Sequence, residues 1–200
     1  VGGAAVNLIP SELPEDIYGV VASVVRKKIE NDDSDVAREW LKYGIDRKAA
    51  KRSVMTLPYG STRYSAVKFI DEYIQKRIDA GEKLVFANRQ AAAVYLSTLV
   101  WNSIGEVVIK APLAMAWLQK VARLCAEQKT PVFWVTPLGF PVRQAYYSQV
   151  ETVLKTKMMG RIRIRSTTDK VDKRRQANGI SPNFVHSLDA TVMLLTTAYA

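Results

Sequence analysis

Residues 47–60 read RKAAKRSVMTLPYG, with Arg47, Lys51, Met55 and Tyr59 at intervals of four residues. In an α-helix this spacing places the four side chains on one face over about three turns. Two cations lie toward the N-terminal end of that face, and an aromatic hydroxyl lies at the other end. The stretch therefore predicts a helix with one chemically distinct face.

The chemistry of this face suits a nucleoside triphosphate. Arg47 offers a planar fork of donors for phosphate oxygens, and Lys51 offers a point charge beside it. The N-terminal half of a helix also favours an anion. Met55 provides a soft apolar surface for a base, Tyr59 a ring and a hydroxyl, and Gly60 room for close approach. The alternative is an amphipathic helix whose basic residues face solvent.

Most of the chain before residue 130 has helical periodicity. Apolar residues recur at helical spacing, and Asp46, Gly44, Gly81 and Pro112 fall where caps, stops and first turns are expected. The pattern predicts helices over about 17–29, 36–44, 46–59, 64–80, 90–104 and 112–128.

The character of the sequence changes after Thr130. Residues 132–135 favour a strand, 137–139 a turn and 140–150 an extended chain. Residues 150–167 predict a long hairpin that turns near Gly160. The polar stretch 168–178 predicts a loop, and a last helix is expected to start near Ser181-Pro182 and to run to the chain end.

Composition narrows the class of protein. The chain has 200 residues, a net charge of +10, a sequence pI of about 9.7 and 48% hydrophobic residues. This favours a packed domain that binds polyanions, nucleic acid first. The single cysteine, Cys125, excludes an internal disulfide, and the single histidine, His186, excludes a multi-histidine metal site. No stretch approaches the roughly 20 apolar residues of a membrane span, and the first residue is not Met, which suggests a fragment or a processed chain.

The spacing of the 47–60 stretch resembles the signature helix of right-hand polymerases. The run KRSVMTLPYGS, residues 51–61, is similar almost residue for residue to the version in phage-type single-subunit DNA-directed RNA polymerases. Related family A DNA polymerases usually have Phe where this chain has Met55, so the resemblance indicates RNA synthesis. Further segments match in the right order over the whole chain: residues 1–8 with 16–18, 134–137, 139–141 and 182–190.

This resemblance implies an α+β, mainly α fold: the fingers subdomain of a right-hand polymerase with an inserted β-hairpin. The expected organisation is a helical core over 1–130 that contains the nucleotide-binding helix 46–60. A β-rich insertion over 131–178 follows, with a promoter-specificity-like hairpin at 150–167. Residues 179–200 are expected to form a helix that leads back to the palm.

The resemblance also implies roles for single residues. Lys51 is expected to contact the incoming triphosphate and to act as the general acid for pyrophosphate departure. Arg47 holds the triphosphate, and Tyr59 closes the pocket and helps to select ribose. His186 is expected to hydrogen-bond near the ribose 2′-hydroxyl. Without the matching Asn183-Phe184-Val185 that precedes it, a lone histidine on a helix would more often be structural.

The hairpin 150–167 occupies the place of the family's promoter specificity loop. Arg161, Arg163 and Arg165 alternate and so share one face of a strand, and a two-stranded ribbon fits the DNA major groove, where arginine reads guanine. Arg163 matches a base-reading arginine of the family, while Lys155 and Arg165 replace amides, so a relative's promoter does not transfer. The alternative is an edge strand kept soluble by its charges.

Basic residues also cluster just after the hairpin, where phosphate contact and simple solvation are equally compatible with the sequence: Lys170, Lys173, Arg174 and Arg175.

The implied cofactor is Mg²⁺, held by carboxylates that stabilise the attacking and leaving oxygens. In this family the ligand aspartates lie in motifs shortly before the position of Val1 and beyond Ala200, so we expect no metal ligand here and an inactive isolated segment. Asp189 belongs to the helix match, and the acidic run 32–35 is expected to be a solvated turn.

The expected partners are template and promoter DNA, ribonucleoside triphosphates and the RNA product. The implied parent is a monomeric, phage-encoded nucleotidyltransferase that acts in transcription. It is expected to work in the cytoplasm of a bacterial host and not at a membrane. The mitochondrial branch of the family fits less well. Two alternatives remain open at this point: a family A DNA polymerase, and a non-catalytic nucleic-acid-binding module, which would not need the 47–60 spacing.

Overall fold

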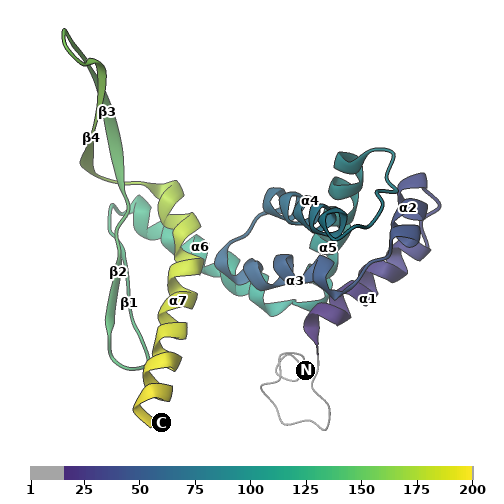
Figure 1. Ribbon diagram of the computed structural model, residues 1–200. Coiled ribbons are helices and arrows are strands. Elements are labelled where there is room, and N and C mark those ends of the chain that lie inside the picture. The colour runs from purple at the N-terminus through teal and green to yellow at the C-terminus, as the bar shows by residue number, and fades with distance from the viewer. Residues whose placement is uncertain (1–15, 200) are drawn as a thin grey trace. The chain divides into compact units, whose positions relative to one another are not determined.

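The computed structural model describes residues 16–199 and divides into two compact units, one ending at Pro112 and one beginning at Leu113. Helices dominate, and the strands form two separate antiparallel pairs (Figure 1). The expectation of a mainly helical α+β chain with an inserted hairpin is therefore confirmed. The matching segment 1–8 lies outside the described residues.

The first unit is a set of helices, each of which begins where the sequence places a cap. They are α1 (Ile17–Glu30), α2 (Asp35–Tyr43), α3 (Arg47–Thr56) with the 3-10 turn η2 (Leu57–Tyr59), α4 (Arg63–Asp79) and α5 (Arg89–Val107). The N-cap side chains, which accept hydrogen bonds from backbone N–H groups of the first turn, are Asp16, Ser34, Asp46, Thr62 and Asn88. The predicted helices of this region are confirmed to within a few residues.

Trp40 lies at the centre of an aromatic cluster in the first unit. Its side chain is fully buried, and its ring lies 4.5 Å from the ring of Phe86 and 5.9 Å from that of Tyr43. The indole Nε1 donates a hydrogen bond of 3.0 Å to the carbonyl oxygen of Ala92 on α5. This tryptophan thus joins α2 to α5 through both apolar contact and a satisfied polar group.

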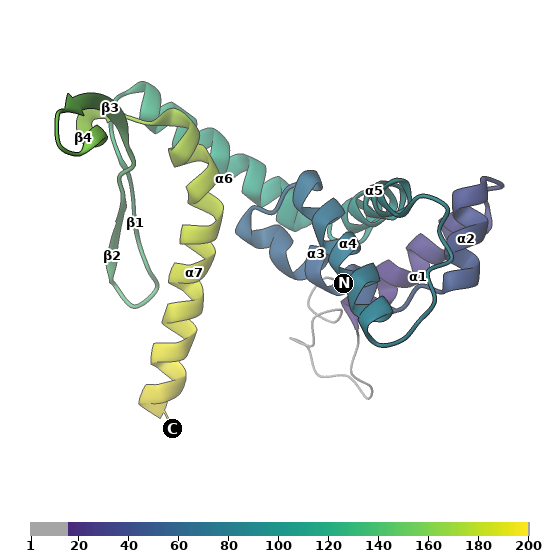
Figure 2. The ribbon, with the colours of Figure 1, turned by 45° about the horizontal axis from the view of Figure 1, so that its top comes forward.

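The second unit combines two helices with the two strand pairs. Its elements are α6 (Lys110–Glu127, which begins just before the boundary), β1 (Val132–Val135), β2 (Pro141–Gln144), β3 (Tyr147–Thr156), β4 (Gly160–Val171) and α7 (Lys173–Tyr199). The β1–β2 hairpin lies along α7 in two views (Figures 1 and 2). Ala122, Val132 and Ile180 form the buried centre, with Cys125 packed against it as a half-buried free thiol.

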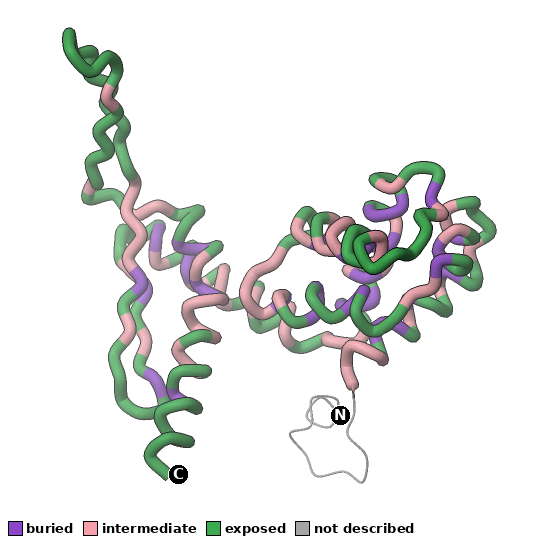
Figure 3. Tube along the Cα trace, viewed as in Figure 1, coloured by how far each residue is buried: buried purple, intermediate pink, exposed green. Residues whose placement is uncertain are grey.

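The β3–β4 ribbon is exposed along most of its length (Figure 3). Thr156 pairs with Gly160 across the turn, and Tyr147 pairs with Val171 at the base, with a register irregularity near Gln149. The predicted hairpin is confirmed and is longer than its expected limits of 150 and 167.

Two expectations for the segment after the ribbon are wrong. Residues 168–178 do not form a loop, since β4 continues to Val171, and α7 begins at Lys173 rather than near Ser181-Pro182. The Asp172 side chain accepts a hydrogen bond of 2.9 Å from the Arg175 N–H, and so the helix is capped earlier than the Ser-Pro pair suggested. Pro182 consequently lies inside the helix.

Within residues 16–199, no single helix is long and apolar enough to cross a membrane; α5 and α6 pass that test only when they are counted together across their break.

Candidate nucleotide and nucleic-acid site

The motif helix is α3 followed by η2. The Asp46 carboxylate accepts hydrogen bonds from the backbone N–H groups of Lys48 and Ala49, at 2.9 and 3.3 Å, and so fixes where the helix begins. The helix tightens into a 3-10 turn at Leu57–Tyr59, and Gly60 ends it in the left-handed region at φ 81°. Glycine adopts this conformation without the steric cost of a side chain, so the predicted 46–60 unit has clear physical limits.

The motif face of α3 points away from the core. Ala49, Ala50, Ser53 and Val54 are buried on one side of the helix, which is the side that packs against α1, α4 and α5. The Met55 side chain on the opposite side is 48% exposed. Arg47 and Lys51 are also exposed and Tyr59 is half-buried, so the first three motif side chains are open to a ligand.

A cavity of about 650 Å³ opens beside this face. Its size falls within the range typical of small-molecule sites, roughly 300–1,000 Å³. Lys51 and Met55 line it, whereas Arg47 and Tyr59 do not. The lining is rich in cations from α1, α3 and α4: Arg26, Lys48, Lys51, Arg52, Lys76 and Arg77.

Three of these cations form ion pairs within the protein, and one of them is Arg26, which lies 3.5 Å from Glu30. Arg52 forms an ion pair with Glu72 and lies 4.3 Å from the centre of the Phe69 ring. Arg77 pairs with Glu82 at 2.5 Å, and this hydrogen bond is the main cause that holds the pKa of Arg77 above its ordinary value. Such arginines act as fixed walls of the cavity rather than as mobile ligands.

The lysines of the cavity are not held in this way. Within residues 16–199, the side chains of Lys48, Lys51 and Lys76 form no hydrogen bond or ion pair. An ammonium group without a fixed partner remains available to an anion. The cavity therefore joins free positive charge to an apolar wall formed by Met55 and Phe69.

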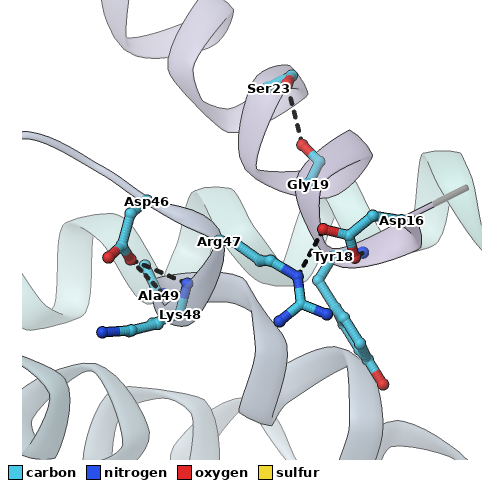
Figure 4. A network of polar contacts seen from close by, with 8 residues as sticks. All are labelled: Asp16, Tyr18, Gly19, Ser23, Asp46, Arg47, Lys48 and Ala49. Carbon is cyan, nitrogen blue, oxygen red and sulfur yellow. Dashed lines mark hydrogen bonds and ion pairs between the residues drawn. The ribbon is translucent and has the colours of Figure 1, made fainter. Parts of the chain in front are cut away.

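Arg47 lies at the edge of this region and has a partner that the sequence reasoning missed. Its Nε donates to Oδ2 of Asp16 at 2.5 Å, and its guanidinium carbon lies 4.8 Å from the centre of the Tyr18 ring (Figure 4). Burial alone would raise the pKa of Asp16. The hydrogen bond and charge of Arg47, with the N–H groups of Gly19 and Tyr18, outweigh that effect and lower the pKa below its ordinary value. No local signal indicates this pair.

His186 lies in the second unit, exposed on α7, whereas Arg47, Lys51 and Tyr59 lie together in the first unit. Its helix is fixed by neighbours from the same motif. The Asn183 amide donates to Oε1 of Gln144 at 2.8 Å and to the Tyr146 hydroxyl at 3.0 Å, and Phe184 packs against Trp134 at 5.9 Å. Asn183 and Phe184 thus have a structural role, because their contacts fix α7 in place.

A buried polar pair joins the hairpin to the same helix. The amides of Gln144 and Gln176, which are almost completely buried, bond to each other at 2.8 Å and to each other's backbone carbonyls. Next to them, a Cβ at Gly179 would lie 2.6 Å from the Tyr146 ring, so only glycine lets the ring approach this closely. These contacts connect the base of the ribbon to α7.

The ribbon register places the predicted DNA-binding residues on one face. Arg161 pairs with Lys155, Arg163 with Val153, and Arg165 with Glu151. Directly paired residues in an antiparallel ribbon point to the same side. Arg161, Arg163, Arg165 and Lys155 therefore share a face.

Glu151 is the residue of this face that the sequence reasoning missed. Its carboxylate lies 3.4 Å from Arg163 Nε and 3.2 Å from Arg165 Nε. Counting residues outward from the Gly160 turn would have placed Glu151 opposite Arg165. The face is therefore basic with one carboxylate in its middle.

No metal site is formed by the part of the chain that the structure describes. Residues 16–199 contain no group of three or more His, Cys, Asp or Glu side chains arranged to hold an ion. The acidic run 32–35 leads into α2, which begins at Asp35, and Asp32 accepts hydrogen bonds from the Tyr95 hydroxyl at 2.6 Å and from the Ser34 N–H at 2.9 Å. The hydrogen bond from Tyr95 is the main cause that lowers the pKa of Asp32. Asp32 thus has a structural role, and residues 16–199 offer no set of ligands that fits Mg²⁺.

Comparison with known proteins identifies the family. The sequence pattern of the DNA-dependent RNA polymerases matches residues 1–200. This chain belongs to the DNA-dependent RNA polymerase family. Its similarity extends to T7 RNA polymerase of Escherichia phage T7, with 36% identity, and to the DNA-directed RNA polymerase of Enterobacteria phage K11, with 35%. The expected membership is confirmed.

These polymerases are much longer than the chain. The matches cover all of the chain but 28% of the T7 protein and 27% of the K11 protein. The mitochondrial DNA-directed RNA polymerase of Mus musculus is 35% identical, again over the whole chain and over 16% of its own length. Phage and organellar polymerases therefore share this segment at similar identity.

Proposed function

We propose that this chain is the fingers segment of a phage-type, single-subunit DNA-directed RNA polymerase that transfers nucleotides from ribonucleoside triphosphates to a growing RNA. The observation that carries the proposal is the exposed Arg47, Lys51, Met55 face of α3 beside a cavity rich in free lysines. A polymerase needs such a face because its substrate combines a polyanion with an aromatic base whose ring face packs against apolar groups.

Each residue of this face has a role in the proposed reaction. Lys51 neutralises the triphosphate and gives a proton to the departing pyrophosphate, since no residue of the described range 16–199 holds its ammonium group. Arg47 grips phosphate oxygens with its fork. Tyr59, on the 3-10 turn beside Gly60, closes the pocket near the sugar. Met55 offers its exposed thioether to the base.

His186 and Tyr59 are proposed to select ribose. A 2′-hydroxyl both donates and accepts hydrogen bonds, so a site built for it rejects the deoxy sugar by leaving polar groups unpaired. The polymerase that contains this chain should extend an RNA primer on a DNA template with rNTPs far faster than with dNTPs, and Tyr59→Phe and His186→Ala should each narrow that ratio about tenfold or more.

Single-nucleotide incorporation rates with matched rNTP and dNTP measure this ratio, and Tyr64→Phe, on an exposed tyrosine next to the motif, is the matched control. A wild-type preference for dNTPs would support the family A DNA polymerase alternative. Nucleic-acid binding without any incorporation would support the non-catalytic module.

The proposed reaction uses Mg²⁺, whose ligands we place in other parts of the polymerase because the described residues do not form a site for it. When bound, the metal would stabilise the charge that develops on the reacting oxygens. The residues of this chain would bind and orient the triphosphate and protonate the departing pyrophosphate. We therefore propose that the 200-residue chain alone binds nucleotide but does not polymerise.

The β3–β4 ribbon is proposed to read promoter DNA. It projects as an exposed two-stranded element with Arg161, Arg163, Arg165 and Lys155 on one face. A ribbon of this kind fits the major groove, where an arginine can bind guanine O6 and N7 together. In the same proposal, residues 1–130 form the helical fingers core, 131–178 the insertion and 179–200 the connection to the palm.

Arg163→Ala should relax base preference at one promoter position, at a cost of about 1–3 kcal/mol for the preferred base. The measurement is selection of DNA duplexes from one randomised pool, first by the wild-type polymerase and then by the variant. The base preferences of the two selected sets are compared position by position. Lys157→Ala removes one charge from the exposed turn and should weaken binding to all DNA sequences by the same factor. If Arg163→Ala also weakens binding to all DNA sequences by the same factor, the arginine contacts phosphate or only keeps the strand soluble.

The partners of the whole protein would be template and promoter DNA, rNTPs and the RNA product, with the polymerase acting as a monomer. The 51–61 run favours the phage branch, and with it the cytoplasm of a bacterial host, although relatives also include mitochondrial and chloroplast enzymes.

A further inference from the structure

Arg47 is held from one side by Asp16. The Asp16 Oδ2 accepts a hydrogen bond from Nε of Arg47 at 2.5 Å, and the guanidinium plane lies near the ring of Tyr18 (Figure 4). The two residues are 31 positions apart in sequence, on either side of α1 and α2. Two contacts, one ionic and one aromatic, therefore restrict a side chain that would otherwise sample many rotamers.

The direction of this contact leaves the functional end of Arg47 open. Asp16 occupies only Nε, and within residues 16–199 neither terminal nitrogen, Nη1 or Nη2, donates to a protein acceptor. Figure 4 shows both terminal nitrogens without a partner among the residues drawn. Two parallel donors in one plane match two oxygens of a phosphate group.

Asp16 itself is fixed. Its other oxygen, Oδ1, accepts a hydrogen bond from the Tyr18 N–H at 3.2 Å and so caps the N-terminus of α1. The charge and hydrogen bond of Arg47 lower the pKa of this carboxyl against the opposing effect of its burial, so it is ionised at neutral pH. The carboxylate is thus a rigid, charged support rather than a mobile counter-ion.

We propose that Asp16 is a positioning residue for substrate binding, which holds Arg47 side-on through Nε and presents its two terminal nitrogens to the triphosphate. The inference rests on the proposed role of Arg47 and adds a residue that supports it. Asp16 does not touch the substrate. Its effect is to reduce the rotamer freedom that Arg47 loses when a triphosphate binds.

The opposite role makes the opposite prediction. If Asp16 competed with the triphosphate for Arg47, its removal would tighten substrate binding. If it only positions Arg47, its removal weakens binding, and only while Arg47 is present. The sign of the change in KM, and its dependence on Arg47, therefore separate the two roles.

The test uses the polymerase that contains this chain and measures KM and kcat for single-rNTP incorporation. Asp16→Ser keeps an N-cap acceptor but is too short to reach Arg47, and Asp16→Asn keeps the cap and the shape but removes the charge. Both should raise KM about tenfold, the size expected for one charge-assisted hydrogen bond, with kcat within about twofold. Asp16→Glu should recover part of the loss.

The double variant Asp16→Ser with Arg47→Ala should have the KM of Arg47→Ala alone, because a positioning residue has no effect without the residue it positions. The matched control is Asp35→Asn, which removes the carboxylate of another exposed arginine pair, Asp35 with Arg38, and should leave KM unchanged. Thermal unfolding of each variant, which should stay within a few degrees, separates positioning from a loss of the α1 cap.

An unchanged or lowered KM in Asp16→Ser would overturn the inference, as would an equal rise in KM in the Arg47→Ala background. Failure of the proposed function looks different: Arg47→Ala and Lys51→Ala would then leave incorporation unchanged by themselves.

Discussion

We expect Lys51→Ala to slow nucleotide incorporation by the polymerase that contains this chain about 10²–10⁴-fold, the contribution of a positioned general acid. The reason lies in the environment of Lys51. Its ammonium group lines a cavity of about 650 Å³ on the open face of α3 and has no hydrogen bond or ion pair among residues 16–199. In the proposed reaction Lys51 gives a proton and a charge to the leaving pyrophosphate, and the substitution removes both.

Single-turnover incorporation on a primed template measures the chemical step directly, because multiple-turnover rates also include product release. Lys68→Ala is the matched control: it removes an exposed lysine from α4 that does not line the cavity, and should leave the rate unchanged. Incorporation by Lys51→Ala at the wild-type rate would show that Lys51 is not the general acid and that α3 is not the triphosphate site.

Trp40→Ala destabilises the first unit by about 3–5 kcal/mol, the range measured for large aromatic side chains removed from cores. Trp40 is fully buried, packs against Phe86 and Tyr43, and bonds to the Ala92 carbonyl. The substitution opens a cavity and leaves that carbonyl with one hydrogen bond fewer. Because the substitution removes the contact between α2 and α5, it also destabilises the packing of the helices that support α3.

Chemical denaturation of the 200-residue chain, followed by helical circular dichroism, measures this loss without relying on tryptophan fluorescence. Trp117→Ala is the matched control, since that side chain is 63% exposed on α6 and should change stability by about 1 kcal/mol or less. Equal losses for the two tryptophans would contradict the assignment of Trp40 to the core.

The two tryptophans show where sequence reasoning stops. Both lie on helices with mixed apolar and charged residues, and helical periodicity alone does not predict which of the two is buried. Trp40 is covered because Phe86 and α5 pack over it from more than 40 residues away in the chain. Nothing in the local sequence around residue 117 or residue 40 reports that difference.

Local chemistry was enough for the helices. A cap such as Asp46 and stops such as Gly44 and Gly60 act within one turn of the residues they serve, so their positions could be read directly from the sequence. The family also followed from local runs, above all residues 51–61, and the match over residues 1–200 confirmed it.

The segment after the ribbon was misjudged because its signals are not local. Residues 168–178 are polar, as loops are, yet Gln176 is fully buried and pairs with Gln144 on another element. Ser181-Pro182 is a good helix start by sequence, but the earlier cap at Asp172 and the packing of Ile180 extend the helix before it. Tertiary hydrogen bonds overrode a sound local preference.

The sequence by itself determined the helices of the first unit, the two hairpins, the family and the open face of α3, because spacing, capping and turn residues act over a few positions. Only the tertiary structure decided that Asp16 holds Arg47 and that Lys51 borders a cavity with other lysines that no described residue holds. Those contacts join residues far apart in the chain, and their partners are set by how helices and strands pack.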